Sequence, residues 1–193
     1  MPHNALRILL TGAPQAGKTT LVRRIVAGLA TSGIAVGGFI TGELREQGRR
    51  VGFLVEAIGG GSAVLAHVAR TEGPVVGRFH VDVPAFERVA LPALDRAARE
   101  CDVLVIDEIG LMELYSDAFV HAVRRIFELD VALVATVQAR AHPVTDDLKR
   151  RPGVKLLMMT RDARDAMLAQ VTAYVLDGLT AAAQRTGGPR PEL

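Results

Sequence analysis

The chain has 193 residues, 49% of them hydrophobic, and its 23 Lys and Arg against 21 Asp and Glu give a formal net charge of +2. A chain of this length and apolar content can bury a substantial core, which predicts one globular domain rather than two. The small charge and an aromatic content of 4% without Trp argue against a nucleic-acid binder, which uses basic surfaces and stacking side chains.

The residues that mark cellular compartment and metal binding are few. Cys101 is the single cysteine, so neither an intramolecular disulfide nor a cysteine-rich metal site can form, and a reducing compartment fits. No apolar run approaches the roughly 20 residues of a membrane span. The five histidines lack metal-ligand spacing. We therefore expect a soluble cytoplasmic protein without a membrane partner or a transition-metal site.

The first predicted elements are a strand, a glycine-rich loop and a helix. Residues 6–10 form an apolar run closed by Thr11 and Gly12, as in parallel strands covered on both faces. From Lys18 to about Ala30 the apolar residues recur at helical spacing, and TSG follows as a stop signal.

The rest of the chain continues to alternate strands and helices. Two strands around the polar turn ELREQGRR, in which Gly48 suits a positive φ, predict a β-hairpin. The alternation predicts an α/β fold whose mainly parallel sheet has helices on both faces and an antiparallel hairpin inserted near one edge. We place one domain over residues 1–179 and expect the remainder, 180–193, to be a flexible tail. The predicted elements are hairpin strands 37–41 and 51–58, a strand in VVGRFHVDV, helix 86–100, strand 102–107, helix 118–129, strands 131–137 and 155–159, and a closing helix.

The loop after the first strand satisfies the phosphate-loop pattern G-x-x-x-x-G-K-[ST]. Such a loop curls so that its backbone N–H groups point inward, and the following helix directs its positive end at the same anion. Lys18 would then reach the β- and γ-phosphates and the Thr19 hydroxyl would ligate Mg²⁺. The alternative is a glycine-rich turn with Lys18 in solvent, but the flanking elements favour the phosphate loop. Its predicted nucleotide-binding residues are Gly12, Ala13, Pro14, Gln15, Ala16, Gly17, Lys18, Thr19 and Thr20.

A second group of candidate site residues ends the apolar run VLVIDEIG, at the strand end where open α/β sheets bind ligands. Asp107 matches the carboxylate that holds Mg²⁺ beside a phosphate loop, and Glu108 is placed to polarise an attacking water. The alternative is a solvated strand end. We predict Thr19 and Asp107 as metal ligands, Lys18 and Glu108 as catalytic residues, and Gly110 as a further nucleotide-binding residue.

A third group lies at the predicted hairpin. Thr41, Glu43 and Arg45 stand where its first strand meets the turn, a common position for substrate contacts in P-loop folds. Ordinary hairpin polarity explains the same residues equally well. Separately, His142 precedes Pro143 and is therefore predicted in an extended turn.

Four blocks of sequence together resemble the small nucleoside-triphosphatase family that includes the cancer-related nucleoside-triphosphatases. The phosphate loop is shared by many superfamilies, whereas the hairpin and DEIG-x-MEL blocks are more specific. The resemblance implies a RecA-like P-loop fold and slow, Mg²⁺-dependent hydrolysis of several nucleoside triphosphates, ATP and GTP among them. The blocks are TGAPQAGKTTL, GGFITGELREQGRRVGF, VVGRFHVDVPAFERVALPAL and VIDEIGLMEL.

The chain departs from this family at Leu111, where members commonly read DEIGKMEL. If the family lysine approaches the γ-phosphate, its loss removes a stabilising charge, and supplied cations of this kind are worth about 10³ to 10⁵ in rate in other P-loop enzymes. Another cation could replace it. The candidates are Arg45, Arg49, Arg50 and Arg140.

The sequence thus favours a nucleoside triphosphatase, with two alternatives open. One is a small-molecule or nucleotide kinase, against which stands the lack of a recognisable acceptor pocket or arginine-rich lid. The other, suggested by Leu111, is a nucleotide-dependent binding or regulatory protein with little turnover. No N-K-x-D guanine-reading motif occurs, which fits broad base specificity.

Overall fold

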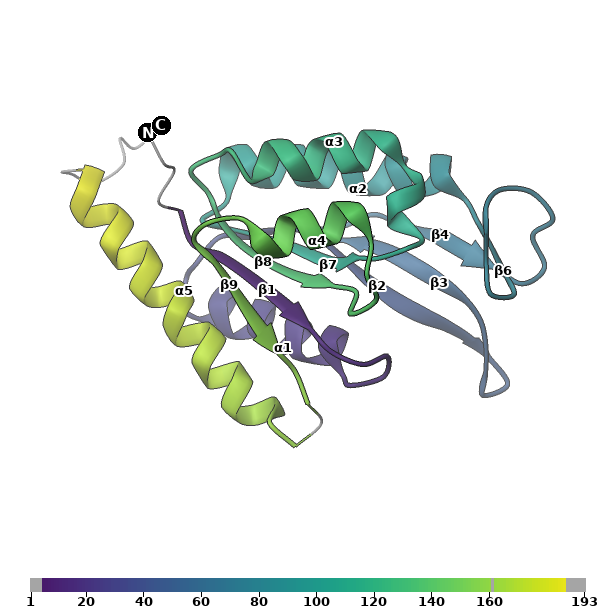
Figure 1. Ribbon diagram of the computed structural model, residues 1–193, viewed down its shortest axis with the longest axis horizontal. Coiled ribbons are helices and arrows are strands. Elements are labelled where there is room, and N and C mark those ends of the chain that lie inside the picture. Colours follow the sequence, from purple (N-terminus) through teal and green to yellow (C-terminus); the bar gives the residue numbers. More distant parts are fainter. Residues whose placement is uncertain (1–4, 161, 187–193) are drawn as a thin grey trace.

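The computed structural model describes residues 5–160 and 162–186, which form a nine-stranded mixed sheet with helices on both faces (Figure 1). The predicted α/β class is confirmed. The strands are β1 (Arg7–Thr11), β2 (Val36–Glu46), β3 (Arg49–Ala57), β4 (Ser62–His67), β5 (Val75–Val76), β6 (Phe79–Val81), β7 (Val103–Ile109), β8 (Ala132–Val137) and β9 (Val154–Met158). The helices are α1 (Lys18–Thr31), α2 (Val83–Glu100), α3 (Asp117–Ile126), α4 (Pro143–Arg150), α5 (Arg164–Thr186) and the short 3₁₀ helix η1 (Glu113–Tyr115).

One half of the sheet is parallel, with the strands in the order β2-β7-β8-β1-β9. Strand β8 therefore lies between β1, which leads into the glycine loop, and β7, which carries Asp107. Because these strands run the same way, their carboxyl ends reach one edge of the sheet.

The other half is antiparallel and extends the sheet beyond β2 in the order β3-β4-β6-β5. The predicted hairpin is present, with longer strands than expected, and Gln47 (φ 46°) and Gly48 (φ 77°) form its turn. The prediction of a single strand in VVGRFHVDV was wrong, because the segment forms the two strands β5 and β6. Gly77, at φ 62°, instead turns the chain between β5 and β6.

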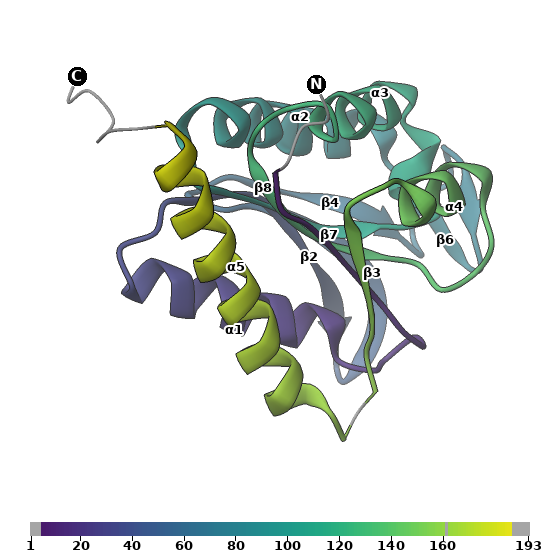
Figure 2. The ribbon, with the colours of Figure 1, turned by 60° about the vertical axis from the view of Figure 1, so that its left-hand side comes forward.

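Two hydrophobic cores cover the two faces of the sheet, because successive strand residues point to opposite sides. On β7, Leu104 and Ile106 belong to the core under α2 and α3, whereas Val103 and Val105 belong to the core under α1 and α5. Figure 2 shows α1 and α5 on one face and α2, α3 and α4 on the other. This arrangement confirms the helices predicted on both faces.

Helix α5 corrects the predicted tail. It continues to Thr186, so residues 180–186 are helical, while 187–193 lie outside the described residues. Contrary to the expectation from apolar runs, its segment Arg164–Gln184 has the length and the mean hydropathy, 1.2, of a membrane span. The likeness is one of length and composition, and 17% of the segment is buried, with Met167, Val171 and Val175 packed into the core beside α1.

Candidate nucleotide-binding site

The predicted site residues come together at the carboxyl edge of the parallel strands. Ile40 of β2 pairs with Asp107 of β7, which places Thr41 beside the Asp107–Glu108 segment. The loop after β1 and Gln138 after β8 end at the same edge. Parallel pairing thus assembles residues that are distant in sequence.

The glycine loop has the backbone of an anion cradle. Gln15 (φ 63°) and Gly17 (φ 93°) adopt left-handed conformations, and the Ala16 N–H donates to the Ala13 carbonyl at 3.1 Å. Helix α1 begins at Lys18 with no side-chain cap and no acidic residue in its first turn. Its first N–H groups therefore lack a side-chain acceptor and suit an anionic ligand.

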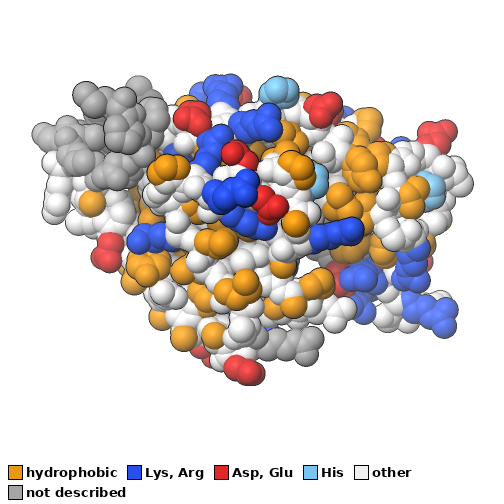
Figure 3. All heavy atoms as spheres, in the orientation of Figure 1, with side chains coloured by type: hydrophobic (Ala, Val, Ile, Leu, Met, Phe, Trp, Pro, Cys, Tyr) orange, Lys and Arg blue, Asp and Glu red, His pale blue; other side chains and the backbone are white. Residues whose placement is uncertain are grey.

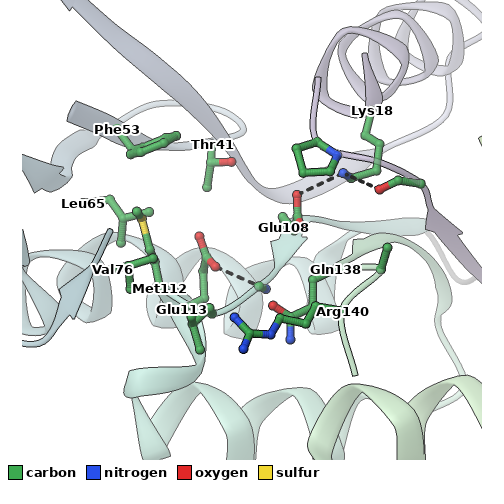
Figure 4. A pocket seen from close by; sticks show the side chains of 15 residues that line it. Lys18, Thr41, Phe53, Leu65, Val76, Glu108, Met112, Glu113, Gln138 and Arg140 are labelled. Carbon is green, nitrogen blue, oxygen red and sulfur yellow. Dashed lines mark hydrogen bonds and ion pairs between the residues drawn. The ribbon is translucent and has the colours of Figure 1, made fainter. Parts of the chain in front are cut away.

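Lys18 lies against the carboxylate of Glu108 rather than in solvent. Its Nζ donates to the Gly12 carbonyl at 3.3 Å and stands 3.6 Å from Glu108 Oε2 (Figure 4). The Lys18 side chain is only 10% exposed, against 28% for Glu108. Burial raises the pKa of Glu108, and the charge of Lys18 acts against this rise. The two predicted catalytic residues are therefore in direct contact.

Asp107 has the surroundings of a cation ligand. It is completely buried, and its Oδ1 accepts a hydrogen bond from Thr136 Oγ1 at 2.6 Å. Its Oδ2 is buried without a hydrogen-bond partner among the described residues. Burial raises the pKa of Asp107, while hydrogen bonding from Thr136 and Thr19 and the charge of Lys18 oppose it.

This unpartnered oxygen and the nearby Thr19 hydroxyl fit a divalent cation, which prefers oxygen ligands. Within the described ranges, no group of three or more His, Cys, Asp or Glu side chains is arranged to hold a metal. A cation bound by Thr19 and Asp107 would therefore complete its shell with water and phosphate oxygens.

Two adjoining cavities open beside the loop. The outer cavity, about 900 Å³, extends from Gly17 and Thr19 to the β2–β3 hairpin. The inner chamber, about 410 Å³, extends to Met112 and Arg140. Five residues line both cavities and form the boundary between them, namely Pro14, Lys18, Thr41, Phe53 and Glu108.

The hairpin contributes a charged wall to the outer cavity. Glu43 binds two arginines, Arg45 Nη2 at 2.5 Å and Arg50 Nη1 at 2.8 Å. Burial acts to raise the pKa of Glu43, but hydrogen bonds and charge from these arginines lower it below its usual value. Figure 3 shows Lys and Arg side chains gathered at the hairpin end of the molecule.

The fold divides the four candidate replacement cations between different parts of the site. Arg45 and Arg50 line the outer cavity, Arg49 lines neither cavity, and Arg140 lines the inner chamber together with Glu108. Leu111 lines the inner chamber as well. Of the four arginines, Arg140 thus shares a cavity with both Leu111 and Glu108.

Sequence reasoning missed Glu113, which is 5% exposed and lines the inner chamber. Its Oε2 accepts a hydrogen bond from the Gly110 N–H at 3.2 Å. Burial, with the negative charge of Glu108, raises the pKa of Glu113 to about 8. Gly110, expected to bind nucleotide, lines the inner chamber and uses its N–H to hold Glu113. The sequence signal for Glu113 was its place in the DEIG-x-MEL block.

Gln138 and Arg164 were missed as well. Gln138 lines the inner chamber after β8. A Cβ on Gly17 would come within 2.9 Å of Arg164 Nη2, so the guanidinium lies against the loop, and its buried Nε has no hydrogen-bond partner in the described part of the chain. No sequence motif marks either residue, since each reaches the site through the end of a strand or the start of a helix.

The loop geometry and the strand order, with β8 between β1 and β7, place this chain in the class of RecA-like P-loop proteins. Comparison with known proteins identifies the family within this class. A family model described as NTPase matches residues 7–172, and the chain belongs to this nucleoside-triphosphatase family.

The alignments with relatives span nearly the whole length of each relative. The chain is 39% identical to nucleoside-triphosphatase THEP1 of Methanopyrus kandleri, over 93% of this chain and 98% of that protein. It is 37% identical to the crystal structure of THEP1 from Aquifex aeolicus, with a TM-score of 0.81 over 88% and 99% of the two chains. It is 34% identical to the solution structure of a human cancer-related nucleoside triphosphatase, with a TM-score of 0.77 over 90% of this chain and 98% of that chain. These matches confirm the family and the fold expected from the sequence.

Proposed function

We propose that this chain hydrolyses nucleoside triphosphates to the diphosphate and phosphate, with Mg²⁺ as cofactor. The observation that carries the proposal is the contact between Lys18 and Glu108, 3.6 Å apart on the boundary of the two cavities. It pairs the cation that would bind the terminal phosphates with the carboxylate that would act on water beside them. The names of the relatives, nucleoside-triphosphatases, support the same activity.

The outer cavity is the proposed triphosphate site. Its lining includes Gly17, Lys18 and Thr19, so the uncapped N–H groups at the start of α1 face the phosphates. A bound Mg²⁺, held by Thr19 and Asp107, would neutralise phosphate charge. Lys18 transfers its contact from Glu108 to the phosphates. Glu108 then accepts a proton from the attacking water, whose oxygen bonds to the γ-phosphorus. The bond between this phosphorus and the bridging oxygen breaks with its electrons on the diphosphate.

The proposed substrate range is broad and includes ATP and GTP. At about 900 Å³ the outer cavity is within the size range of small-molecule sites, and no guanine-reading N-K-x-D motif restricts the base. We also propose a cytoplasmic location, on the ground that the single cysteine suits a reducing compartment.

A phosphate-release assay over ATP, GTP, CTP and UTP, with Mg²⁺ or with EDTA, tests this function. We expect Mg²⁺-dependent release with each nucleotide. Lys18→Ala should lower release sharply, since it removes the cation of the loop. Glu108→Gln should lower it by about 10² to 10⁴, the usual loss of a general base, while a fluorescent nucleotide still binds.

Glu72→Gln is the matched control, because Glu72 is exposed and lines neither cavity. We expect it to release phosphate at the wild-type rate. If Glu108→Gln also keeps the wild-type rate, Glu108 is not the base. If no variant or nucleotide condition gives phosphate, the chain is not a hydrolase.

A further inference from the structure

The inner chamber is larger than hydrolysis requires. A water molecule occupies about 30 Å³ of liquid volume, and small-molecule sites start near 300 Å³. The chamber measures about 410 Å³ and adjoins the outer cavity in which the triphosphate is placed, with five lining residues in common. It therefore has room for a second small molecule.

The walls of the chamber have the composition of a ligand site. Phe53, Leu65 and Met112 provide apolar surface on one side, and Gln138 and Arg140 lie on the other (Figure 4). A mainly apolar wall with a few convergent polar groups is typical of pockets for small organic molecules.

Glu113 adds a buried polar group to this chamber. One carboxyl oxygen accepts from the Gly110 N–H, and the other points into the chamber (Figure 4). With its pKa raised to about 8, the carboxyl is mostly protonated at neutral pH and can donate a hydrogen bond to a neutral ligand. The chamber thus offers donors from Glu113, Gln138 and Arg140 to a molecule with acceptor atoms at its edge.

The position of the chamber relates this molecule to the reaction. Lys18 and Glu108 line both cavities, so the chamber meets the outer cavity where the terminal phosphate would lie. A hydroxyl group held in the chamber would approach the same phosphorus and the same carboxylate as the attacking water.

We propose that the inner chamber binds a nucleoside and that the chain transfers the γ-phosphoryl group of a nucleoside triphosphate to its hydroxyl. A nucleoside combines a flat ring for the apolar wall, acceptor atoms on the ring edge and a hydroxyl to react. The hydroxyl oxygen bonds to the γ-phosphorus, the bond to the bridging oxygen breaks with its electrons on the diphosphate, and the hydroxyl proton passes to Glu108. The products are a nucleoside monophosphate and a nucleoside diphosphate. The inference rests on the proposed function, in which water takes the place of this hydroxyl.

The test incubates the full chain with Mg²⁺ and γ-labelled ATP, alone and with adenosine, guanosine, cytidine, uridine or thymidine. Diphosphate, free phosphate and labelled monophosphate are measured together. We expect at least one nucleoside to become labelled and the diphosphate to exceed free phosphate by the same amount. Equal diphosphate and phosphate with every nucleoside, without labelled monophosphate, overturns the inference and leaves the hydrolase intact. No diphosphate under any condition overturns both.

A pair of neighbouring valines provides matched variants. Val76 lines the chamber, whereas Val75 is 53% exposed and lines neither cavity. Val76→Phe should fill the chamber and lower the ratio of transfer to hydrolysis about tenfold or more, equivalent to at least about 1.4 kcal/mol. Val75→Phe should leave the ratio unchanged. An unaltered ratio in Val76→Phe contradicts the placement of the nucleoside in the chamber.

Discussion

Replacing Glu113 with glutamine should remove a loss of stability that the wild-type protein suffers as the pH rises. Glutamine has nearly the same shape, and its side-chain oxygen can still accept the hydrogen bond from the Gly110 N–H. It differs in having no proton to lose. The wild-type carboxyl ionises readily in the unfolded chain but is held protonated in the fold by burial, with the charge of Glu108 adding to the effect.

The direction and size follow from the two pKa values. Between the ordinary value of 4.5 and the folded value of about 8, the folded state binds a proton that the unfolded state has released. The free energy of unfolding of the wild type therefore falls with rising pH across this window. From about pH 5 to about pH 7 the loss relative to Glu113→Gln amounts to about 2 to 3 kcal/mol. For a domain of this size that corresponds to a relative Tm change of roughly 5 to 10 °C.

Thermal and urea unfolding of both proteins at several pH values from about pH 5 to about pH 9 measures the difference. We expect the free energy of unfolding of Glu113→Gln, relative to that of the wild type, to increase steadily with pH and to level off above about pH 8. The control is Glu72→Gln, which replaces an exposed carboxylate and should track the wild type. A difference that stays constant with pH would show that Glu113 is ionised in the fold and would refute the reasoning.

Three further substitutions test other features. Gly38→Ala should lower the free energy of unfolding by about 2 to 4 kcal/mol in urea titrations, because Gly38 has φ 113° and a Cβ would lie 2.0 Å from the Val105 carbonyl oxygen. A loss under about 1 kcal/mol would contradict this. Thr136→Val keeps the shape but removes the hydrogen bond to buried Asp107, so we expect a loss of about 1 to 3 kcal/mol by the same method, and no loss would mean that the bond adds nothing. Leu111→Lys should raise phosphate release about tenfold or more by placing a cation in the inner chamber, whereas the control Leu111→Met should not. Equal rates for Leu111→Lys and the wild type would show that another group already supplies the charge.

The parallel half of the fold was predictable because its strands are buried on both faces and therefore appear as continuous apolar runs. Residues 103–106 and 132–135 are such runs. The antiparallel half was less accessible. Strand β4 is half-exposed and follows three glycines, and β5 and β6 are too short for a periodic pattern. Helix α4 was missed because it spans only Pro143–Arg150, although His142 is extended before it as predicted.

The candidate site shows the same division. Lys18, Thr19, Asp107 and Glu108 could be predicted because their chemistry requires a fixed spacing or a strand end, and the structure brings them together. Glu113 and the inner chamber could not, since the chamber exists only where residues from seven strands or the segments that follow them converge.

The hairpin shows a further limit of sequence reasoning. Arg45 and Arg50 were candidate cations because each stands beside the predicted turn. The sequence could not indicate that one carboxylate, Glu43, binds them both, because that depends on the pairing of β2 with β3. An incoming phosphate would therefore compete with Glu43 for these arginines.

The contact between Lys18 and Glu108 also couples substrate binding to protons. While the site lacks nucleotide, burial raises the pKa of the Glu108 carboxyl, and the charge of Lys18 limits this rise. When nucleotide binds without Mg²⁺, phosphates that draw the lysine away and add negative charge nearby raise that pKa further, so binding takes up protons from the medium. A bound Mg²⁺ would oppose this rise. The heat of binding measured by calorimetry will then vary with the ionisation enthalpy of the buffer. In the absence of Mg²⁺, rising pH will therefore weaken nucleotide binding.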